Sequence, residues 1–411
     1  MDEKIIEDYS LYYCYLNAGY HEDSVQRKIR NQILALDVNG IRTKGVFFYF
    51  ETNKVEKPIA VDKSFIFVSK GPEPTGYFRS LKAKRASVLA FKKWMKINKA
   101  SIPFIYLRYD GASYLLYRFC KKYGSVIGLE FQSKNINEIR NNASYNPFGL
   151  RPSKLLSWIE HQFIPLSNEE IFGRLIAGKV NFILGVTREI AEWNQKRSLF
   201  RKPPIFSLGN GVSAEGVSPH SGVNFDGKTI KFMILIGAAK GATWNGIERI
   251  LKSMKQYKGE YKLELHVAGI TDELEGVKEP FIVQHGFLSG GALEQLVENC
   301  HIAFGAFAMD KIQLTEGSTM KMREYAARGI PCVYGHEDAD YIPLVNMGLA
   351  YRVKTPEAFA FQDVVQFAVK AMSIPNYADK IRDYAVNHLD FKVKMKVLKE
   401  IIEKQKQKAL V

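Results

Sequence analysis

The chain contains 411 residues, of which 46% are hydrophobic and 25% are charged. This composition supports two or three domains with full cores and excludes a globally disordered protein. No apolar run approaches the ~18 residues that a membrane-spanning helix needs, and the acidic N-terminus lacks the features of a signal peptide. The four cysteines are scattered without metal-ligand spacing, so we expect reduced, buried thiols in a cytoplasmic protein.

The net charge of +15 is concentrated in the first half of the chain. Residues 1–210 contain 33 basic and 19 acidic residues, whereas the remaining residues contain 25 and 24. The positive electrostatic field of this half suits an anionic partner. A membrane surface, a phosphorylated acceptor and a nucleic acid are the three alternatives. The change in charge also indicates a domain boundary near the middle of the chain.

The first half opens with strands and helices in alternation. Residues 11–16 predict a strand, residues 25–36 an amphipathic helix and residues 45–50 a second strand. The turn after the first strand contains Gly19. This order of elements predicts a parallel sheet.

Residues 79–99 predict a helix with one apolar and one strongly basic face. The segment contains eight lysines and arginines, no acidic residue and seven interleaved apolar side chains. This combination suits a helix that lies on an anionic membrane surface. An ordinary surface helix packed on the sheet remains the alternative.

Two predicted strands in the first half end in charged residues. Residues 104–110 predict a strand that contains Arg108, and residues 126–130 predict a strand that ends at Glu130. Open parallel sheets bind ligands at the carboxyl ends of their strands. Arg108 and Glu130 are therefore candidate acceptor-side residues, although Glu130 also fits a surface carboxylate.

The second half repeats the alternation of strands and helices. Residues 230–237 predict a strand, which is followed by a glycine-rich turn and a helix over residues 247–254. Further strands are predicted at residues 263–269, 281–287 and 301–307, with a helix at residues 292–299. The last segment, residues 377–407, predicts two helices.

The stretch from Glu316 to Pro331 predicts a helix between a capped start and a defined end. Ser318 or Thr319 can cap the helix, and Gly329 ends it. Glu324 follows Glu316 by eight residues, which places it within roughly 80° of the same helix face. Both carboxylates are therefore expected to point into one cleft above the helix N-terminus. The free N–H groups at this N-terminus suit the binding of a phosphate.

The spacing of Glu316 and Glu324, followed by a helix and Arg-Gly-Ile-Pro, resembles the donor-site motif of GT-B glycosyltransferases, in particular family 4. The run from Ser318 to Tyr325 is similar to members that build bacterial surface polysaccharides. The resemblance implies that Glu316 contacts the donor sugar as the catalytic residue and that Glu324 holds the nucleotide ribose. It also implies an α/β chain of two Rossmann-like domains facing across a cleft, a reaction with retention, and neither a metal ion nor a cofactor.

The resemblance also implies the domain boundaries. Residues 210–212, Asn-Gly-Val, resemble the hinge between the two domains, although Gly209 replaces the usual proline and Ser213 the usual acid. We therefore expect an acceptor-binding domain over residues 1–208 and a donor-binding domain over residues 209–385. The helix over residues 386–411 is expected to pack back on the first domain.

Further donor-binding residues are implied by their positions in the family pattern. The turn with Gly19 lies under the donor phosphates, and Lys240 supplies one cation of the phosphate clamp. Asn245 stands where the family has a second cation, and Lys321 can compensate for it. His285 lies beside the base. The expected donor-binding set is Gly19, Lys240, Asn245, His285, Gly317, Ser318, Thr319, Met320, Lys321 and Glu324.

These observations predict a glycosyltransferase that moves a sugar from a nucleotide-sugar donor to a saccharide acceptor. We expect this acceptor to be linked to a lipid carrier and the reaction to belong to surface polysaccharide synthesis. The segment Arg79–Lys99 is expected to hold the enzyme on the inner face of the cytoplasmic membrane, and no nucleic-acid partner is expected. Two alternatives remain open. One is a nucleotide-sugar epimerase of the GT-B type, and the other is a non-catalytic basic scaffold with a degenerate donor site.

Overall fold

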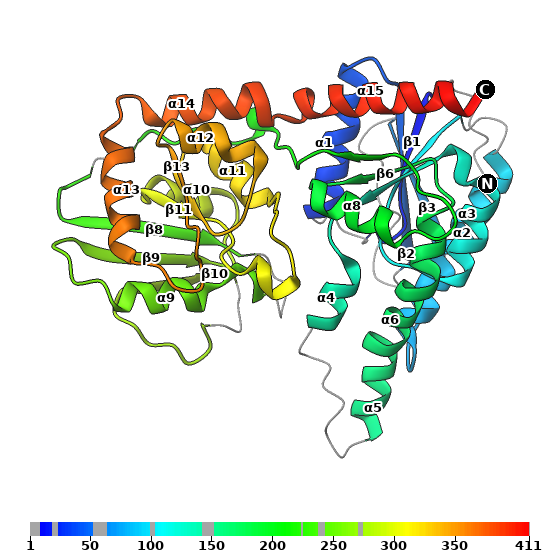
Figure 1. Cartoon of the computed structure of the whole chain (residues 1–411), viewed down its shortest axis with the longest axis horizontal. Coiled ribbons are helices and arrows are strands. Elements are labelled where there is room, and N and C mark those ends of the chain that lie inside the picture. The colour runs from blue at the N-terminus through cyan, green and yellow to red at the C-terminus, as the bar shows by residue number, and fades with distance from the viewer. Residues whose placement is uncertain are drawn as a thin grey trace. The chain divides into compact units, whose positions relative to one another are not determined.

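The computed structural model describes residues 9–18, 24–51, 64–98, 103–141, 152–222, 225–236, 243–269 and 274–410. The chain divides into two compact units (Figure 1). The N-terminal unit comprises residues 1–208 and 394–411, and the C-terminal unit comprises residues 209–393. Each unit contains one parallel sheet with helices packed against it, as the alternation of strands and helices predicts.

The N-terminal unit contains a seven-stranded parallel sheet in the order β3-β2-β1-β4-β5-β6-β7. The strands are β1 (Leu11–Tyr15), β2 (Thr43–Glu51), β3 (Phe65–Pro72), β4 (Ile105–Arg108), β5 (Ile127–Phe131), β6 (Phe182–Gly185) and β7 (Ile205–Ser207). After β1 the chain adds β2 and β3 on one side, and it then returns to place β4 on the other side of β1. The strand order therefore reverses between β1 and β4, which is where open parallel sheets form ligand crevices.

The helices of this unit cover both faces of the sheet. They are α1 (Ser24–Val38), α2 (Arg79–Asn98), α3 (Tyr114–Tyr123), α4 (Asn135–Asn141), α8 (Arg188–Arg197) and most of α15 (Phe391–Leu410). Between α4 and β6, one long helix is assembled from α5 (Pro152–Trp158), α6 (Ile164–Asn168) and α7 (Arg174–Ala177). Two π-helical turns, Ile159–Phe163 and Glu169–Gly173, join these pieces.

The apolar face of α2 packs on the sheet. Phe91 and Trp94 are buried, and their rings lie 5.5 Å and 6.2 Å from the ring of Phe48 on β2. These aromatic side chains therefore pack in the protein core and are not available to insert into a membrane. The lysines Lys92, Lys93 and Lys96 remain exposed on the opposite face.

The C-terminal helix α15 contributes to the core of the N-terminal unit. Leu398 and Ile402 are fully buried. Lys399 Nζ donates to the carbonyl oxygen of Asn39 (2.8 Å), just after α1, and Lys406 Nζ donates to that of Ser10 (3.1 Å), just before β1. The last helix thus closes a unit whose first strand lies almost four hundred residues earlier in the chain.

The C-terminal unit contains a six-stranded parallel sheet in the order β10-β9-β8-β11-β12-β13. The strands are β8 (Thr229–Leu235), β9 (Lys262–Ala268), β10 (Ile282–Gly286), β11 (Ile302–Phe304), β12 (Cys332–Tyr334) and β13 (Ala350–Arg352). The helices are α9 (Ile247–Lys255), α10 (Gly290–Glu298), α11 (Met320–Arg328), α12 (Ile342–Asn346), α13 (Phe361–Ser373) and α14 (Tyr377–Tyr384). Strand order reverses between β8 and β11, so this sheet also has a crevice position.

Two hydrophobic clusters form the core of the C-terminal unit. One includes residues of α10, α11 and α14, and the other includes residues of α9 and α13. The two predicted C-terminal helices are present as α14 and α15, and a π-helical turn over Ala385–Leu389 follows α14. Over the part of the chain that the structure describes, no helix is both long and apolar enough to cross a membrane.

Candidate functional site

The turn before α11 is held in place by backbone pairing on one side. Glu316 and Glu337 form an isolated parallel bridge. In it, Gly317 N donates to the carbonyl oxygen of Glu337, and Glu337 N donates to that of Thr315, each at 2.8 Å. A side chain at Gly317 would collide with the buried ring of His336. Glycine is therefore required here because the backbone passes directly over an imidazole.

The other side of the same turn is fixed by Asn210. The backbone N–H of Asn210 donates to Ser318 Oγ (2.7 Å), and the Asn210 side-chain amide donates to the carbonyl oxygen of Ser318. Thr319 is the N-cap residue of α11, but its side chain makes no capping hydrogen bond. Its Oγ1 is buried and has no hydrogen-bond partner among the residues that the structure describes. The first-turn N–H groups of α11 are thus left without a side-chain cap and can serve a ligand.

A fully buried arginine anchors α11 to the loop after β12. Both terminal nitrogens of Arg323 contact the carboxylate of Asp338, and one of them also donates to Asp340 Oδ2 (2.7 Å). Arg323 Nε donates to the carbonyl oxygen of Asn210 (3.1 Å). Burial alone would lower the pKa of Arg323, but the two carboxylates raise it, so the guanidinium stays charged. This ion cluster sets the direction in which the helix N-terminus points.

The structure brings two of the expected donor-binding residues into contact. Asn245 ends a 3₁₀ turn before α9, and its Oδ1 accepts a hydrogen bond from Lys321 Nζ (2.6 Å). Lys321 lies in the first turn of α11. The ammonium of Lys321 therefore lies beside Asn245.

Glu324 lies two turns into α11 and is held by an arginine. Arg328 Nη2 donates to Glu324 Oε1 (3.0 Å), and the same guanidinium binds both carboxylate oxygens of Glu294 at 2.6 Å and 2.9 Å. The side chain of Glu324 is 34% exposed, which leaves it accessible to a ligand. Met320, at the start of the helix, is 40% exposed.

His285 belongs to a histidine pair at the edge of this sheet. His285 Nε2 lies 3.0 Å from His266 Nδ1, and the two rings are stacked. Burial, with the neighbouring charge of His285, lowers the pKa of His266. The sequence reasoning missed His266, although the two histidines lie near the ends of adjacent parallel strands. Two other expected donor-binding residues, Gly19 and Lys240, lie outside the described residues.

In the N-terminal unit, Glu130 is the centre of a buried polar cluster. Glu130 on β5 accepts from the hydroxyl of Tyr13 on β1 (2.5 Å), from Gln132 Nε2 (2.8 Å) and from Lys28 Nζ on α1 (3.4 Å). Glu130 is only 2% exposed, so the interpretation of it as a surface carboxylate is wrong. We call Tyr13, Lys28, Gln32, Glu130 and Gln132 the Glu130 cluster. The sequence reasoning missed Tyr13, which neither charge nor a motif distinguishes from the tyrosines beside it.

Opposing effects keep the ions of the Glu130 cluster charged. Burial alone would raise the pKa of Glu130, but the positive charges of Lys28 and Arg108 lower it below its usual value. Burial lowers the pKa of Lys28 to about 8 despite the attraction of Glu130. Arg108 stands opposite Glu130 in the β4–β5 ladder, and its Nη1 is buried with no hydrogen-bond partner among the described residues. The two expected acceptor-side residues are therefore neighbours in space.

No protein-family model matches this chain, and no curated protein sequence matches it. Solved structures do match over nearly the whole chain. Sucrose-phosphate synthase from Thermosynechococcus elongatus has a TM-score of 0.67 at 12% identity, and the match covers 96% of this chain and 98% of that one. The lipopolysaccharide outer core galactosyltransferase WaaB has a TM-score of 0.58 at 15% identity, with 96% and 99% covered. A glycosyltransferase from Rickettsia africae has a TM-score of 0.60 at 9% identity, with 97% and 99% covered.

The chain has the GT-B fold. The similarity to these glycosyltransferases spans both parallel sheets, and it confirms the fold class expected from the sequence. Among the described residues, no group of three or more histidine, cysteine, aspartate or glutamate side chains is placed to hold a metal ion.

The Glu130 cluster yields a first prediction about stability. Lys28→Met leaves the buried carboxylate of Glu130 without its cation, and loss of one partner of a buried ion pair costs roughly 3–5 kcal/mol. We expect the unfolding midpoint of the N-terminal unit to fall accordingly in a denaturant titration followed by circular dichroism. Arg27→Met, at the exposed neighbouring position, should change the unfolding free energy by less than about 0.5 kcal/mol.

A double variant tests the pairing itself. If Lys28 and Glu130 are coupled, Lys28→Met combined with Glu130→Gln should lose less stability than the two single variants together. Additive losses, or equal losses for Lys28→Met and Arg27→Met, would show that the ion pair contributes nothing specific.

Proposed function

We propose that this protein is a glycosyltransferase that moves a sugar from a nucleotide-sugar donor to a saccharide acceptor. The observation that carries the proposal is the uncapped N-terminus of α11, which is fixed by Asn210 and Arg323 and followed by the accessible carboxylate of Glu324. The GT-B fold supports the proposal, because the similar solved structures include a sucrose-phosphate synthase and a galactosyltransferase.

The proposed donor chemistry follows from charge. Breaking the bond between the anomeric carbon and the diphosphate leaves negative charge on the diphosphate and positive charge on the sugar. The first-turn N–H groups of α11 and the ammonium of Lys321 would stabilise the diphosphate. Glu316 would bind sugar hydroxyl groups and offset the positive centre. Glu324, oriented by Arg328, would bind the ribose.

The finer features of the proposal rest on the sequence resemblance. They are retention of configuration, independence of metal ions, a lipid-linked acceptor and a role in surface polysaccharide synthesis. Arg108 and Glu130 are the proposed acceptor-side residues, with Glu130 buried and Arg108 half-buried beside it. Because Glu130 already accepts from three side chains, its proposed role is to orient its neighbours rather than to contact the acceptor.

Nucleotide affinity tests the role of Glu324. A hydrogen bond to a charged group contributes about 1.5–3 kcal/mol, so Glu324→Ala should weaken binding of the nucleoside diphosphate roughly ten- to a hundredfold in calorimetry. Glu294→Ala is the matched control, because it also removes a carboxylate from Arg328 and should leave the affinity nearly unchanged. Equal losses in both variants would mean that Arg328, not Glu324, matters for binding.

Turnover tests the transferase proposal itself. A set of UDP-, GDP-, ADP- and CMP-sugars, screened by thermal shift, should contain one that stabilises the protein. With that donor, Glu316→Gln should abolish transfer to an acceptor while the affinity for the diphosphate changes less than threefold. Wild-type turnover in Glu316→Gln would remove its catalytic role, and stabilisation by none of the donors would contradict a donor site. Epimerisation of the donor without an acceptor would instead indicate the epimerase.

Attachment to a membrane surface is proposed on electrostatic grounds alone. Six basic residues of α2 are exposed, namely Arg79, Lys82, Arg85, Lys92, Lys93 and Lys96, whereas Phe91 and Trp94 are buried. Each basic residue near an anionic leaflet contributes about 1 kcal/mol, and the attraction fades within a Debye length of about 8–10 Å. Lysine and arginine side chains in this helix can therefore hold the protein reversibly on an anionic membrane.

Vesicle sedimentation tests this attachment. The protein should bind anionic but not neutral vesicles at low salt, and changing Lys92, Lys93 and Lys96 to Glu should weaken binding at least about a hundredfold. Changing the exposed Lys252, Lys258 and Lys380 to Glu alters the net charge equally in the C-terminal unit and should have a much smaller effect. Binding that resists high salt, or equal effects of the two triple variants, would contradict a role for α2.

A further inference from the structure

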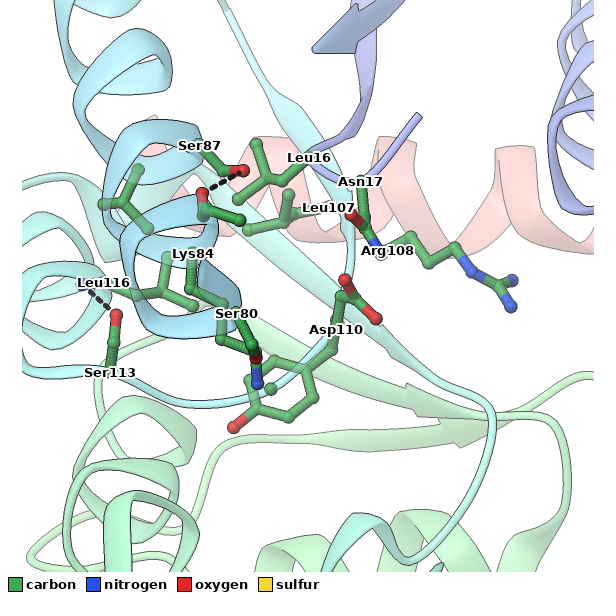
Figure 2. Close-up of a pocket in the computed structure, with 14 residues that line it drawn as sticks. Leu16, Asn17, Ser80, Lys84, Ser87, Leu107, Arg108, Asp110, Ser113 and Leu116 are labelled. Atoms are coloured by element: carbon green, nitrogen blue, oxygen red, sulfur yellow. Dashed lines mark hydrogen bonds between the residues drawn. The ribbon is translucent and has the colours of Figure 1, made fainter. Parts of the chain in front are cut away.

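A cavity of about 220 Å³ opens where the strand order of the N-terminal sheet reverses. Asn17 reaches it from the end of β1, and Asp110 reaches it from the end of β4. The helix α2 contributes Lys84 (Figure 2). Arg108 also lines the cavity, and Figure 2 shows its side chain extending away from Lys84. None of the five residues of the Glu130 cluster lines the cavity. The proposed donor chemistry does not use this cavity.

The side chain of Lys84 is a half-buried cation without a direct partner. Among the residues that the structure describes, no carboxylate or carbonyl oxygen is within ion-pair or hydrogen-bond distance of its ammonium, although its charge acts on Asp110 and Glu169. The backbone of Gly111 packs against it, because a Cβ atom there would lie 2.8 Å from Lys84 Nζ. A partly buried ammonium loses part of its hydration, which an anionic ligand can replace.

Two buried carboxylates hold the walls of the cavity. Glu160 accepts hydrogen bonds from the backbone N–H groups of Phe78 and Ser80, each at 2.9 Å, and so fixes the start of α2. Glu169 accepts from Ala112 N (2.7 Å) and from the hydroxyl of Tyr109 (3.0 Å), and so fixes the loop after β4. Each carboxylate lies on a π-helical turn of the long helix, a feature that recurs at functional sites. The cavity is therefore formed before any ligand arrives.

Three cations surround the carboxylate of Asp110 at the mouth of the cavity. Lys84, Arg108 and Lys70 all act on the carboxylate of Asp110, which also accepts a hydrogen bond from Asn17. The carboxylate of Glu169 is already satisfied by the N–H of Ala112 and the hydroxyl of Tyr109. The ammonium of Lys84 is thus the charge that remains for a ligand.

We propose that this cavity binds a single sugar ring that carries a phosphate or carboxylate group. Lys84 contacts the anionic group, and Asp110 and Asn17 bind ring hydroxyls. Four aliphatic side chains, Leu16, Val88, Leu107 and Leu116, supply the apolar surface against which the C–H groups of a sugar ring can pack. The volume lies below the roughly 300–1,000 Å³ of sites for larger ligands, which favours one ring over an oligosaccharide. The identity of this sugar as the acceptor rests on the proposed transferase function, whereas its binding does not.

Calorimetry with four soluble probes tests the proposal. Glucose 6-phosphate and glucuronate should bind at least tenfold more tightly than glucose, and inorganic phosphate should bind more weakly than glucose 6-phosphate. Lys84→Met, which removes the charge but retains an aliphatic stem, should abolish the preference for the anionic sugars. Arg85→Met is the matched control, because Arg85 is the exposed neighbour and should retain the preference.

A second variant separates the two parts of the site. Asp110→Asn should weaken binding of all three sugars severalfold and leave the preference for the anionic ones intact, and this measurement stands even if Lys84→Met fails to fold. Three results would overturn the proposal: equal affinity for glucose and the anionic sugars, binding of inorganic phosphate as tight as that of glucose 6-phosphate, or no binding of any sugar at millimolar concentration.

The same samples distinguish this inference from the transferase proposal. Binding of a nucleoside diphosphate without binding of anionic sugars would contradict the cavity and leave the donor site intact. Binding of anionic sugars without any nucleotide would do the reverse. If both bind, glucose 6-phosphate and glucuronate offered as acceptors will show whether a free sugar suffices or a lipid-linked chain is needed.

Discussion

Parallel strand pairing is the constraint on which the rest of this structure depends. The carboxyl ends of all strands in a parallel sheet lie on the same side of the sheet. Where the strand order reverses, the loops that follow the two neighbouring strands run in opposite directions and leave a crevice between them. Both sheets of this protein reverse order once, between β1 and β4 and between β8 and β11. The cavity with Lys84 lies at the first reversal. Asn245, which contacts Lys321, lies in the segment that follows β8.

Buried charges organise the loops that surround these positions. Arg323 binds the loop after β12, Glu160 binds the start of α2, and Glu169 binds the loop after β4. Each of these ions is desolvated at a cost and is compensated by hydrogen bonds. A hydrophobic core could supply comparable stability, but it would not fix the direction of backbone N–H groups. We therefore interpret these ions as devices for positioning the loops.

The fold could be predicted well from the sequence, because the spacing of apolar residues indicates where strands and helices lie. The segments of β1, β4, β5 and α11 are found close to where their apolar patterns and glycine signals place them. The side to which a charged residue faces was harder to predict. Glu130 is the last residue of a predicted strand, a position at which a carboxylate can be exposed on the surface. In the structure, however, Tyr13 and Lys28, which lie more than a hundred residues earlier in the chain, contact its carboxylate. Lys84 belongs to a run of basic residues, and only the packing of α2 distinguishes it from its exposed neighbours.

The two π-helical turns in the long helix of the N-terminal unit restrict how this segment can vary in length. A π-helical turn accommodates one more residue than the same stretch of α-helix would. Deleting one residue from the α-helical stretch between the two turns, Ile164–Asn168, would instead rotate the residues that follow by about 100°. Glu169 would then no longer meet Ala112, and the loop after β4 would lose its support. Exposed residues such as Phe163 and Ile171 can be substituted freely. The number of residues between Ile159 and Gly173 is constrained, because the side chains on the buried side of the helix must keep their contacts.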